Sequence, residues 1–275
     1  MNNGIKSLFG SFVMSAMVSG AATAFAQDVT FAYKFETGAV ERHRVKLNQE
    51  VTMGTMAVSN LADMEVTVKC VSGANGKYAM EIKFDKVDVA MTMMGQTSAS
   101  PIGEQLVGQS IAFTTDANGE VTEVKPLGSF DAWPTAQQLV QPVLEGWYPH
   151  LPGNAVAIGG GWKKAGEKKP SASGAETLIN AAYTFKAMKK EKGRDLAVVE
   201  QVLDAVVSGK TALPMGVFLV AGTGKGKGEF LYEPAKGRVV KVKGKIDISM
   251  DMTPEEGGDK MEMVVINHVE RDLLD

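Results

Sequence analysis

Methionine is the residue whose number and spacing point most directly to chemistry in this chain. The sequence has 16 methionines, and six of them stand in i, i+2 pairs, Met91 with Met93, Met250 with Met252 and Met261 with Met263. Alternate residues of a strand point to the same face, so each pair would present two thioethers together. Three interpretations compete. The pairs could fill a core, line an adaptable groove for a lipid-like ligand, or form a soft-metal site, because thioethers select Cu(I).

Other residue types that perform chemistry are not arranged for it. The histidines are His43, His150 and His268, the single cysteine is Cys70, and none of the four has a second ligand at zinc spacing. We expect His43 to lie on a solvated strand face and the other two histidines to have surface or packing roles. The chain has no G-x-S-x-G elbow. We therefore predict a protein that is not an enzyme and has no cofactor.

The segment Gly222–Gly228 invites comparison with a phosphate-binding loop, because it combines glycines with lysines. A phosphate-binding loop requires G-x-x-x-x-G-K-[ST] ahead of a helix, and this pattern is absent. Glycine at every second position indicates instead a strand with one bare face, where the sheet bends or another group approaches closely.

Alternation of apolar and polar residues dominates the rest of the chain. Val29–Phe35 and Val240–Met252 both read as strands with one apolar face. The apolar phase shifts by one residue near Asp85-Lys86, which predicts a β-bulge. Asn75-Gly76 and Asn118-Gly119 supply the positive φ of tight hairpins. The pattern describes an antiparallel sheet with one face in solvent.

Helical spacing stands out in one place. Phe130–Tyr148 has apolar residues at helical intervals, and Pro142 predicts a kink. A shorter helical turn is expected within Ile102–Gly108. Asp195–Ser208 fits either a helix or a strand, and its five valines favour the strand.

A weak internal repeat suggests two lobes. Phe113–Val124 and Phe230–Val242 share the same order of aromatic, glycine and valine positions. We predict a first β lobe over 27–129, a helical linker over 130–162 and a second β lobe over 163–275. Chance similarity between alternating strands is the alternative. The predicted fold class is mainly β, with a curved antiparallel sheet or half-barrel, two similar lobes and a short central helical segment.

The first 26 residues have the composition of a secretory signal peptide. Lys6 is the only charge before Ala26, an apolar stretch follows it, and Ala24-Phe25-Ala26 has small residues at the positions that a signal peptidase requires. We predict cleavage after Ala26, no transmembrane segment, and a periplasmic or extracellular location.

Charge limits the choice of partners. The chain has 29 basic and 32 acidic residues, so we expect no nucleic-acid partner. The charge is uneven, because 160–245 holds 17 basic and 8 acidic residues. A basic surface there could meet anionic headgroups or an acidic partner, and a plain solvated surface is the alternative.

Several short features occur in a fixed order along the chain: Phe31–Phe35 with Gly38, Phe113 with Gly119 and Val124, Leu151-Pro152, Gly160-Gly161-Trp162, and Phe230 with Gly237 and Val240. Their order resembles an uncharacterised family of secreted bacterial β proteins defined as a domain of unknown function. That family is similar in style to periplasmic lipoprotein carriers with half-barrel folds. The resemblance implies a curved-sheet envelope protein and assigns no catalytic residue. Its pattern usually has an acidic residue before the tryptophan, where this chain departs with Gly161.

The leading hypothesis is a non-enzymatic envelope protein that binds a lipid or another apolar small molecule in a curved β-sheet groove. A structural or interaction protein of the cell envelope without a ligand is one alternative, and a methionine-rich copper-binding periplasmic protein is another. In the leading hypothesis the cavity is lined by Met91, Met93, Met250, Met252, Trp133 and Trp147.

Overall fold

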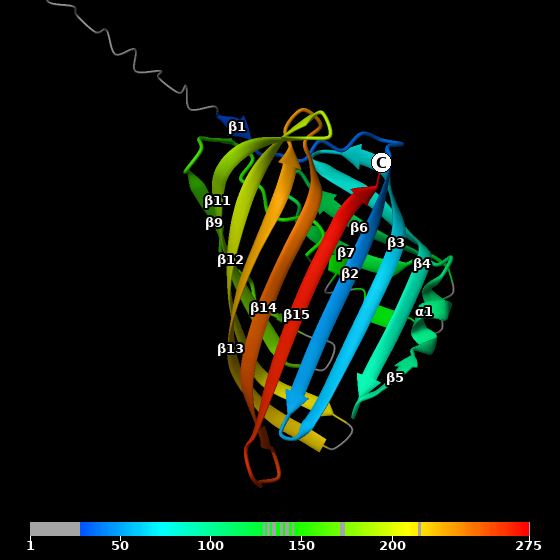
Figure 1. Ribbon diagram of the computed structural model, residues 1–275, viewed down its shortest axis with the longest axis vertical. Helices are drawn as coiled ribbons and strands as arrows, with labels where there is room; N and C mark the ends of the chain where they lie inside the picture. The colour runs from blue at the N-terminus through cyan, green and yellow to red at the C-terminus, as the bar shows by residue number, and fades with distance from the viewer. Residues whose placement is uncertain are drawn as a thin grey trace, which may run out of the picture.

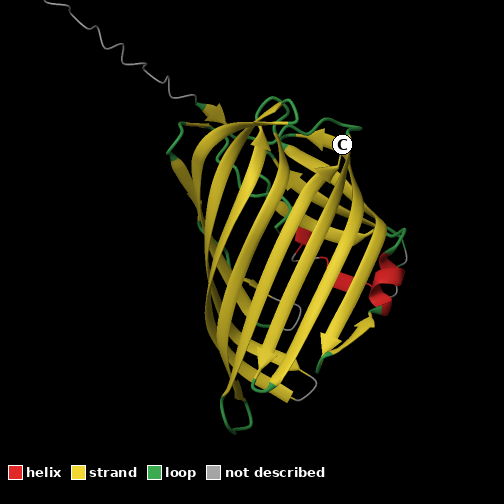
Figure 2. Ribbon diagram, in the orientation of Figure 1, coloured by secondary structure: helices red, strands yellow, loops and turns green. Residues whose placement is uncertain are grey.

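The computed structural model describes residues 28–274 apart from 129, 131–132, 134–135, 138–139, 141–142, 145, 171–173 and 214–215. The predicted signal peptide and the predicted kink at Pro142 lie outside the described residues. Strands dominate the described chain, and the sheet they form is antiparallel and curved, as predicted (Figures 1 and 2). No helix among the described residues is long and apolar enough to cross a membrane.

The elements follow one another in a simple order. They are β1 (Val29–Thr30), β2 (Val40–Met53), β3 (Met56–Ala74), β4 (Lys77–Met93), β5 (Gln96–Ala99), α1 (Pro101–Leu106), β6 (Ser110–Asp116), β7 (Val121–Pro126), β8 (Ala155–Val156), β9 (Gly161–Lys164), β10 (Lys169–Pro170), β11 (Glu176–Glu191), β12 (Arg194–Leu213), β13 (Gly216–Glu233), β14 (Arg238–Pro254) and β15 (Met261–Leu274).

One sheet of 13 strands contains every described strand except β1 and β8, which pair with each other. Its main path runs β10-β11-β12-β13-β14-β15-β2-β3-β4-β6-β7, with β5 added beside β4 and β9 beside β11. The regions 27–129 and 163–275 therefore supply adjoining halves of one sheet, joined where β15 pairs with β2. Among the described residues no pairing joins β7 to β10, so the curved sheet stays open.

Local signals in the sequence are confirmed at the hairpins and at the bulge. Asn75 and Gly76 have φ angles of 53° and 75° in the turn between β3 and β4. Further along β4, Phe84 pairs with Val66 and Lys86 pairs with Glu65, so Asp85 is the extra residue of a bulge. The segment that fitted a helix or a strand forms the strand β12.

The two faces of the sheet differ in what covers them. We call the face that carries Val45 and Met64 the inner face, because both side chains belong to the same buried cluster as Val140, Leu144 and Trp147. The predicted central helix is thereby placed inside the curve of the sheet, behind the front strands in Figure 1. Its described helical residues are Trp133, Ala136, Gln137, Val140, Val143 and Leu144.

The strand predicted over Val29–Phe35 is wrong beyond its first two residues, which form β1. Phe31 and Tyr33 are buried as the alternation indicates. Their backbone nitrogens, however, bond to different loops, Phe31 to the Asn154 carbonyl at 3.1 Å and Tyr33 to the Ala117 carbonyl at 3.0 Å. Alternation reports an extended backbone with one buried side, whereas a strand also needs one continuous partner.

The bare face of β13 marks close packing between two strands. A Cβ atom added at Gly222 would lie 2.4 Å from the Met250 Cβ, and one at Gly224 would lie 2.6 Å from the Ile248 Cγ1. Side chains of β14 therefore cover the β13 backbone, which glycine alone permits.

Candidate ligand-binding surface

Beyond the helical segment, the inner face continues as a surface that is only partly covered. Because the ladders keep their register from β12 to β4, its side chains form four cross-strand rows, which we call the inner surface. Taken from β12 toward β4, the rows are Gln201, Gly228, Gly244, Val269, Leu47, Ala62 and Val89; Leu203, Gly226, Ile246, Asn267, Gln49, Asn60 and Met91; Ala205, Gly224, Ile248, Val265, Val51, Val58 and Met93; and Val207, Gly222, Met250, Met263, Met53 and Met56.

The inner surface carries no charged side chain at any of these described positions. It is nevertheless accessible to solvent, since Met91 is 38% exposed, Met93 is 47% exposed, and most of the central residues are half-buried. The outer face of the same strands is charged, as shown by the ion pair between Arg44 and Asp63. Contiguous exposed apolar surface is a feature of sites where proteins bind ligands or partners.

The structure places the six predicted ligand-lining residues in three positions. Met91 and Met93 lie on β4, while Met250 and Met252 lie on β14, on the same face but with β15, β2 and β3 between them. Met250 and Met252 are buried in a cluster with Phe218 and Val220. Trp147 is buried in the main core and Trp133 packs against that core. The tryptophans are therefore not on the inner surface, and ligand contact by all six residues stays a prediction.

A line of amides, which the sequence pattern did not indicate, crosses the middle of the inner surface. The Gln49 side-chain nitrogen donates to the Asn267 oxygen at 3.0 Å, and the Asn60 nitrogen donates to the Gln49 oxygen at 3.4 Å. All three side chains are half-buried. The available signal was a polar residue in the apolar phase of a strand, such as Asn267 between Val265 and Val269.

The register also brings together thioethers from different strands, whereas the sequence pattern pairs methionines only within single strands. Met250, Met263, Met53 and Met56 occupy one row on four neighbouring strands. Adjacent positions of this kind have Cβ atoms about 4.5–5.5 Å apart. The described residues hold no group of three or more His, Cys, Asp or Glu able to bind a metal ion, so sulfur would be the metal-binding element of this face.

A buried polar cluster borders the inner surface, and it corrects the prediction for His43. That side chain is 1% exposed rather than solvated, because β2 directs it inward while Arg42 and Arg44 point outward. Burial lowers the pKa of His43 to about 4, although its Nε2 lies 3.3 Å from Glu41. Burial opposes ionisation of Glu41 as well, but hydrogen bonds with His43 and Arg238 hold its pKa at about 2.

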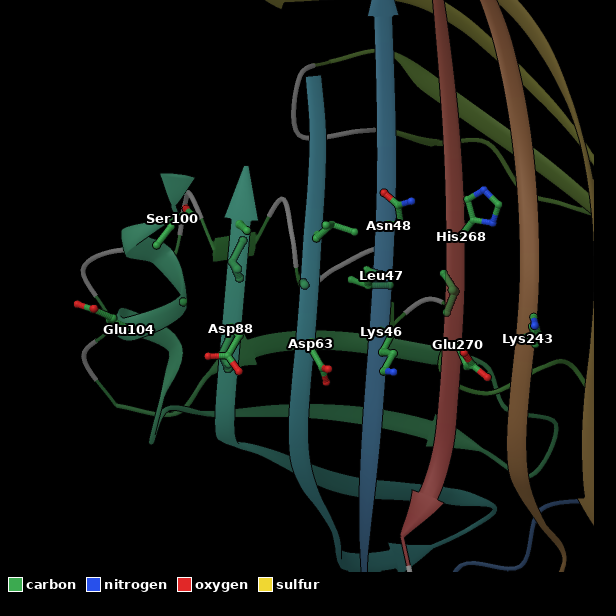
Figure 3. Close-up of a pocket in the computed structure, with 18 of the residues that line it drawn as sticks. Lys46, Leu47, Asn48, Asp63, Asp88, Ser100, Glu104, Lys243, His268 and Glu270 are labelled. Atoms are coloured by element: carbon green, nitrogen blue, oxygen red, sulfur yellow. The ribbon is translucent and has the colours of Figure 1, made fainter. Parts of the chain in front are cut away.

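A second site candidate is a groove of about 790 Å³ that crosses five strands and ends at α1 (Figure 3). Its lining includes the inner-surface positions Leu47, Ala62 and Val89. The residues on both sides of these positions line it as well, and their side chains point to the outer face. One row of its lining is charged, so it suits an apolar ligand less well than the inner surface does. That row contains Lys243, Glu270, Lys46, Asp63 and Asp88.

Comparison with known proteins shows a shared fold. No protein-family model matches the chain, and no curated protein matches it. A solved structure of lipovitellin, concerned with lipid–protein interactions, superposes with a TM-score of 0.55 at 12% identity, covering 88% of this chain and 26% of that chain. The chain thus spans about a quarter of that chain's length. A DUF1329 family protein from Desulfovibrio piger is 8% identical, and the match covers 83% of this chain and 84% of that chain. Its TM-score of 0.16 is too low for any structural argument.

Proposed function

We propose that this protein is a non-enzymatic carrier that holds an apolar, lipid-like ligand against the inner surface of its sheet. The observation that carries the proposal is that this surface is exposed to solvent yet has no charged side chain. The fold shared with lipovitellin, whose structure concerns lipid–protein interactions, supports it. The composition of residues 1–26 supports a periplasmic or extracellular location for the carrier.

The composition of the surface suits ligands of variable shape. Methionine side chains are flexible and polarizable, so Met53, Met93 and Met263 would repack around different apolar chains. Each methylene group removed from water contributes about 0.8 kcal/mol, so affinity would grow with the length of the ligand chain.

A matched pair of lysine substitutions tests the proposal. Met93 on the inner surface and Leu61 on the outer face are both 47% exposed, and they lie on neighbouring strands. We would titrate N-phenyl-1-naphthylamine, an uncharged fluorescent probe, into each purified variant. Met93→Lys should weaken binding about tenfold or more, because the ligand would desolvate a charge, whereas Leu61→Lys should leave it unchanged.

Two outcomes would reject the carrier role. Equal effects of the two lysines would show that the probe does not use the inner surface. A structural or interaction role would be favoured by two results together. The probe would bind saturably to neither the variants nor the wild type, and native mass spectrometry would give the mass of the chain alone.

The methionine row supports a second candidate function, binding of Cu(I). Met250, Met263 and Met53 lie on neighbouring strands of one face, and thioethers select this ion. Anaerobic competition against bathocuproine disulfonate would measure the affinity. Met263→Leu and Met53→Leu conserve volume and should abolish tight binding, whereas Met93→Leu should not. Tight binding that survives both changes would exclude this row.

A further inference from the structure

The amide line on the inner surface occupies a position that its surroundings do not explain. Asn267, Gln49 and Asn60 lie on three consecutive strands, β15, β2 and β3. On these three strands, the residues of the two neighbouring rows have aliphatic side chains. Those flanking residues are Val269, Leu47 and Ala62 on one side, and Val265, Val51 and Val58 on the other.

The two hydrogen bonds run in one direction along this line. Asn60 donates to Gln49, and Gln49 donates to Asn267. The line therefore ends in the Asn267 amide nitrogen, a donor, and in the Asn60 carbonyl oxygen, an acceptor. A ligand group that both accepts and donates hydrogen bonds complements such an arrangement.

Charge on the ligand is disfavoured at the same place. The inner surface supplies no cation to an acidic headgroup and no anion to a basic one. The nearest inward-facing cation along β15 is Arg271, which is 3% exposed and has its guanidinium 4.8 Å from the Trp147 ring centre. Arg271 is thus buried away from a ligand on the inner surface, whereas the amides are half-buried and accessible.

We propose that the ligand is an amphiphile with a long apolar chain and an uncharged, hydrogen-bonding head, such as a hydroxyl, ester or amide, which pairs with the Asn267, Gln49 and Asn60 side chains. This inference rests on the proposed carrier function. The apolar chain then extends over the valine row to the methionine row. Four residues along a strand separate Gln49 from Met53, which is about 13 Å.

Three ligands that compete with N-phenyl-1-naphthylamine test the inference, and the measurement is how much of the probe each one displaces. They are 1-monooleoylglycerol with an uncharged head, oleate with an anionic head, and 1-octadecene with no polar head. The structure predicts that 1-monooleoylglycerol binds most tightly. Gln49→Leu should weaken its binding about tenfold, the effect of one lost hydrogen bond, while 1-octadecene binding is unchanged or improved.

The neighbouring residue on the same strand supplies the control. Asn48 is also a half-buried amide, but β2 directs it to the outer face, where its oxygen accepts from Ser59 at 3.4 Å. Asn48→Leu should leave all three affinities unchanged. Asn267→Leu should repeat the effect of Gln49→Leu, which separates a ligand contact from a local defect at β2.

The outcomes distinguish the two proposals. Failure of all three ligands to displace the probe would reject the carrier function together with this inference. Tight binding of 1-monooleoylglycerol and 1-octadecene that Gln49→Leu and Asn267→Leu do not change would reject the headgroup assignment alone. Preference for oleate that Arg271→Met removes would replace it with an anionic head held by Arg271.

Discussion

The Arg271 guanidinium lies 4.8 Å from the centre of the Trp147 ring, in the interior between the sheet and the helical segment. Its Nε and one Nη atom have no hydrogen-bond partner among the described residues. Burial lowers the pKa of Arg271, although neighbouring Tyr33, Tyr148 and Glu41 oppose this. The indole face is thus a principal contact of a desolvated cation.

Exchanging this cation for an apolar side chain should cost the fold little. Arg271→Met removes a charge whose desolvation is poorly compensated, so we expect the free energy of unfolding to stay within about 1 kcal/mol of wild type or to rise. Trp147→Ala leaves the charge without its ring and opens a cavity, and should cost about 3–5 kcal/mol. Urea unfolding at neutral pH measures both.

Arg238 provides the contrast for the Arg271 prediction. It pairs with Glu233 at 2.8 Å and with Glu41 at 3.1 Å. Arg238→Met leaves the buried Glu233 carboxylate without its partner, and should cost about 2 kcal/mol. A large loss from Arg271→Met and none from Arg238→Met would reverse this assignment of the two cations.

Acid should destabilise the fold through His43. Its pKa is about 4 in the folded protein against 6.5 for a free histidine, so between these values the unfolded chain binds more protons. The contribution is fully present above pH 6.5 and is lost as the pH falls toward 4, by about 3 kcal/mol. Urea unfolding at several pH values between 7 and 4 follows this loss.

Removing the imidazole tests the His43 contribution to the pH dependence. His43→Phe should flatten the dependence between pH 6.5 and 4. It should also reduce the loss below pH 4.5, because the variant lacks the His43 hydrogen bond that lowers the pKa of Glu41 and keeps only the contact with Arg238. An unchanged slope in the variant would assign the acid sensitivity to other groups.

Glycine should be required at Gly224 of β13 but not at Gly244 of the neighbouring strand β14. A Cβ at Gly224 would lie 2.6 Å from the Ile248 Cγ1, whereas a Cβ at Gly244 meets nothing nearer than 3.6 Å. Gly224→Ala should therefore cost about 1–3 kcal/mol, and Gly244→Ala less than about 0.5 kcal/mol. Thermal unfolding of the two variants compares them directly, and equal losses would contradict the packing described for β13.

Export should remove the first 26 residues. We expect intact-mass measurement of the protein recovered from the envelope fraction of a bacterial host to match a chain that begins at Gln27. Ala24→Arg should leave the uncleaved chain, since the peptidase requires a small residue there. Cleavage that persists at the same bond would place the recognition elsewhere.

Much of the fold could be predicted from the sequence because its signals are local. The bulge at Asp85, the turn at Asn75-Gly76 and the strand β12 each follow from residues adjacent in the chain. The error at Val29–Phe35 arose because hydrogen-bond partners are distant in sequence. The error at His43 had the same origin, since the Trp147 side chain that packs against its ring, at 5.2 Å between centroids, lies far along the chain.

The candidate site was less predictable, for a related reason. Alternation places Met250 and Met252 on one face of a strand, but the cross-strand register decides that Met263 and Met53 stand beside Met250. The amides Gln49 and Asn267 are likewise neighbours across strands and remote in sequence.

The pairing of β15 with β2 must form late, because β15 is the last strand of the chain to be synthesised. β2 pairs at once with β3, but its other edge stays unpaired until β15 emerges, as when Val45 meets Arg271. A sheet whose central pairing joins the two ends of the sequence folds slowly. The entropy of closing the long loop between β2 and β15 is lost before the contacts between these strands stabilise the fold. During that interval β2 exposes a long unpaired strand edge, whose free backbone groups can pair with another chain, and its basic side chains Arg42, Arg44 and Lys46 work against such pairing.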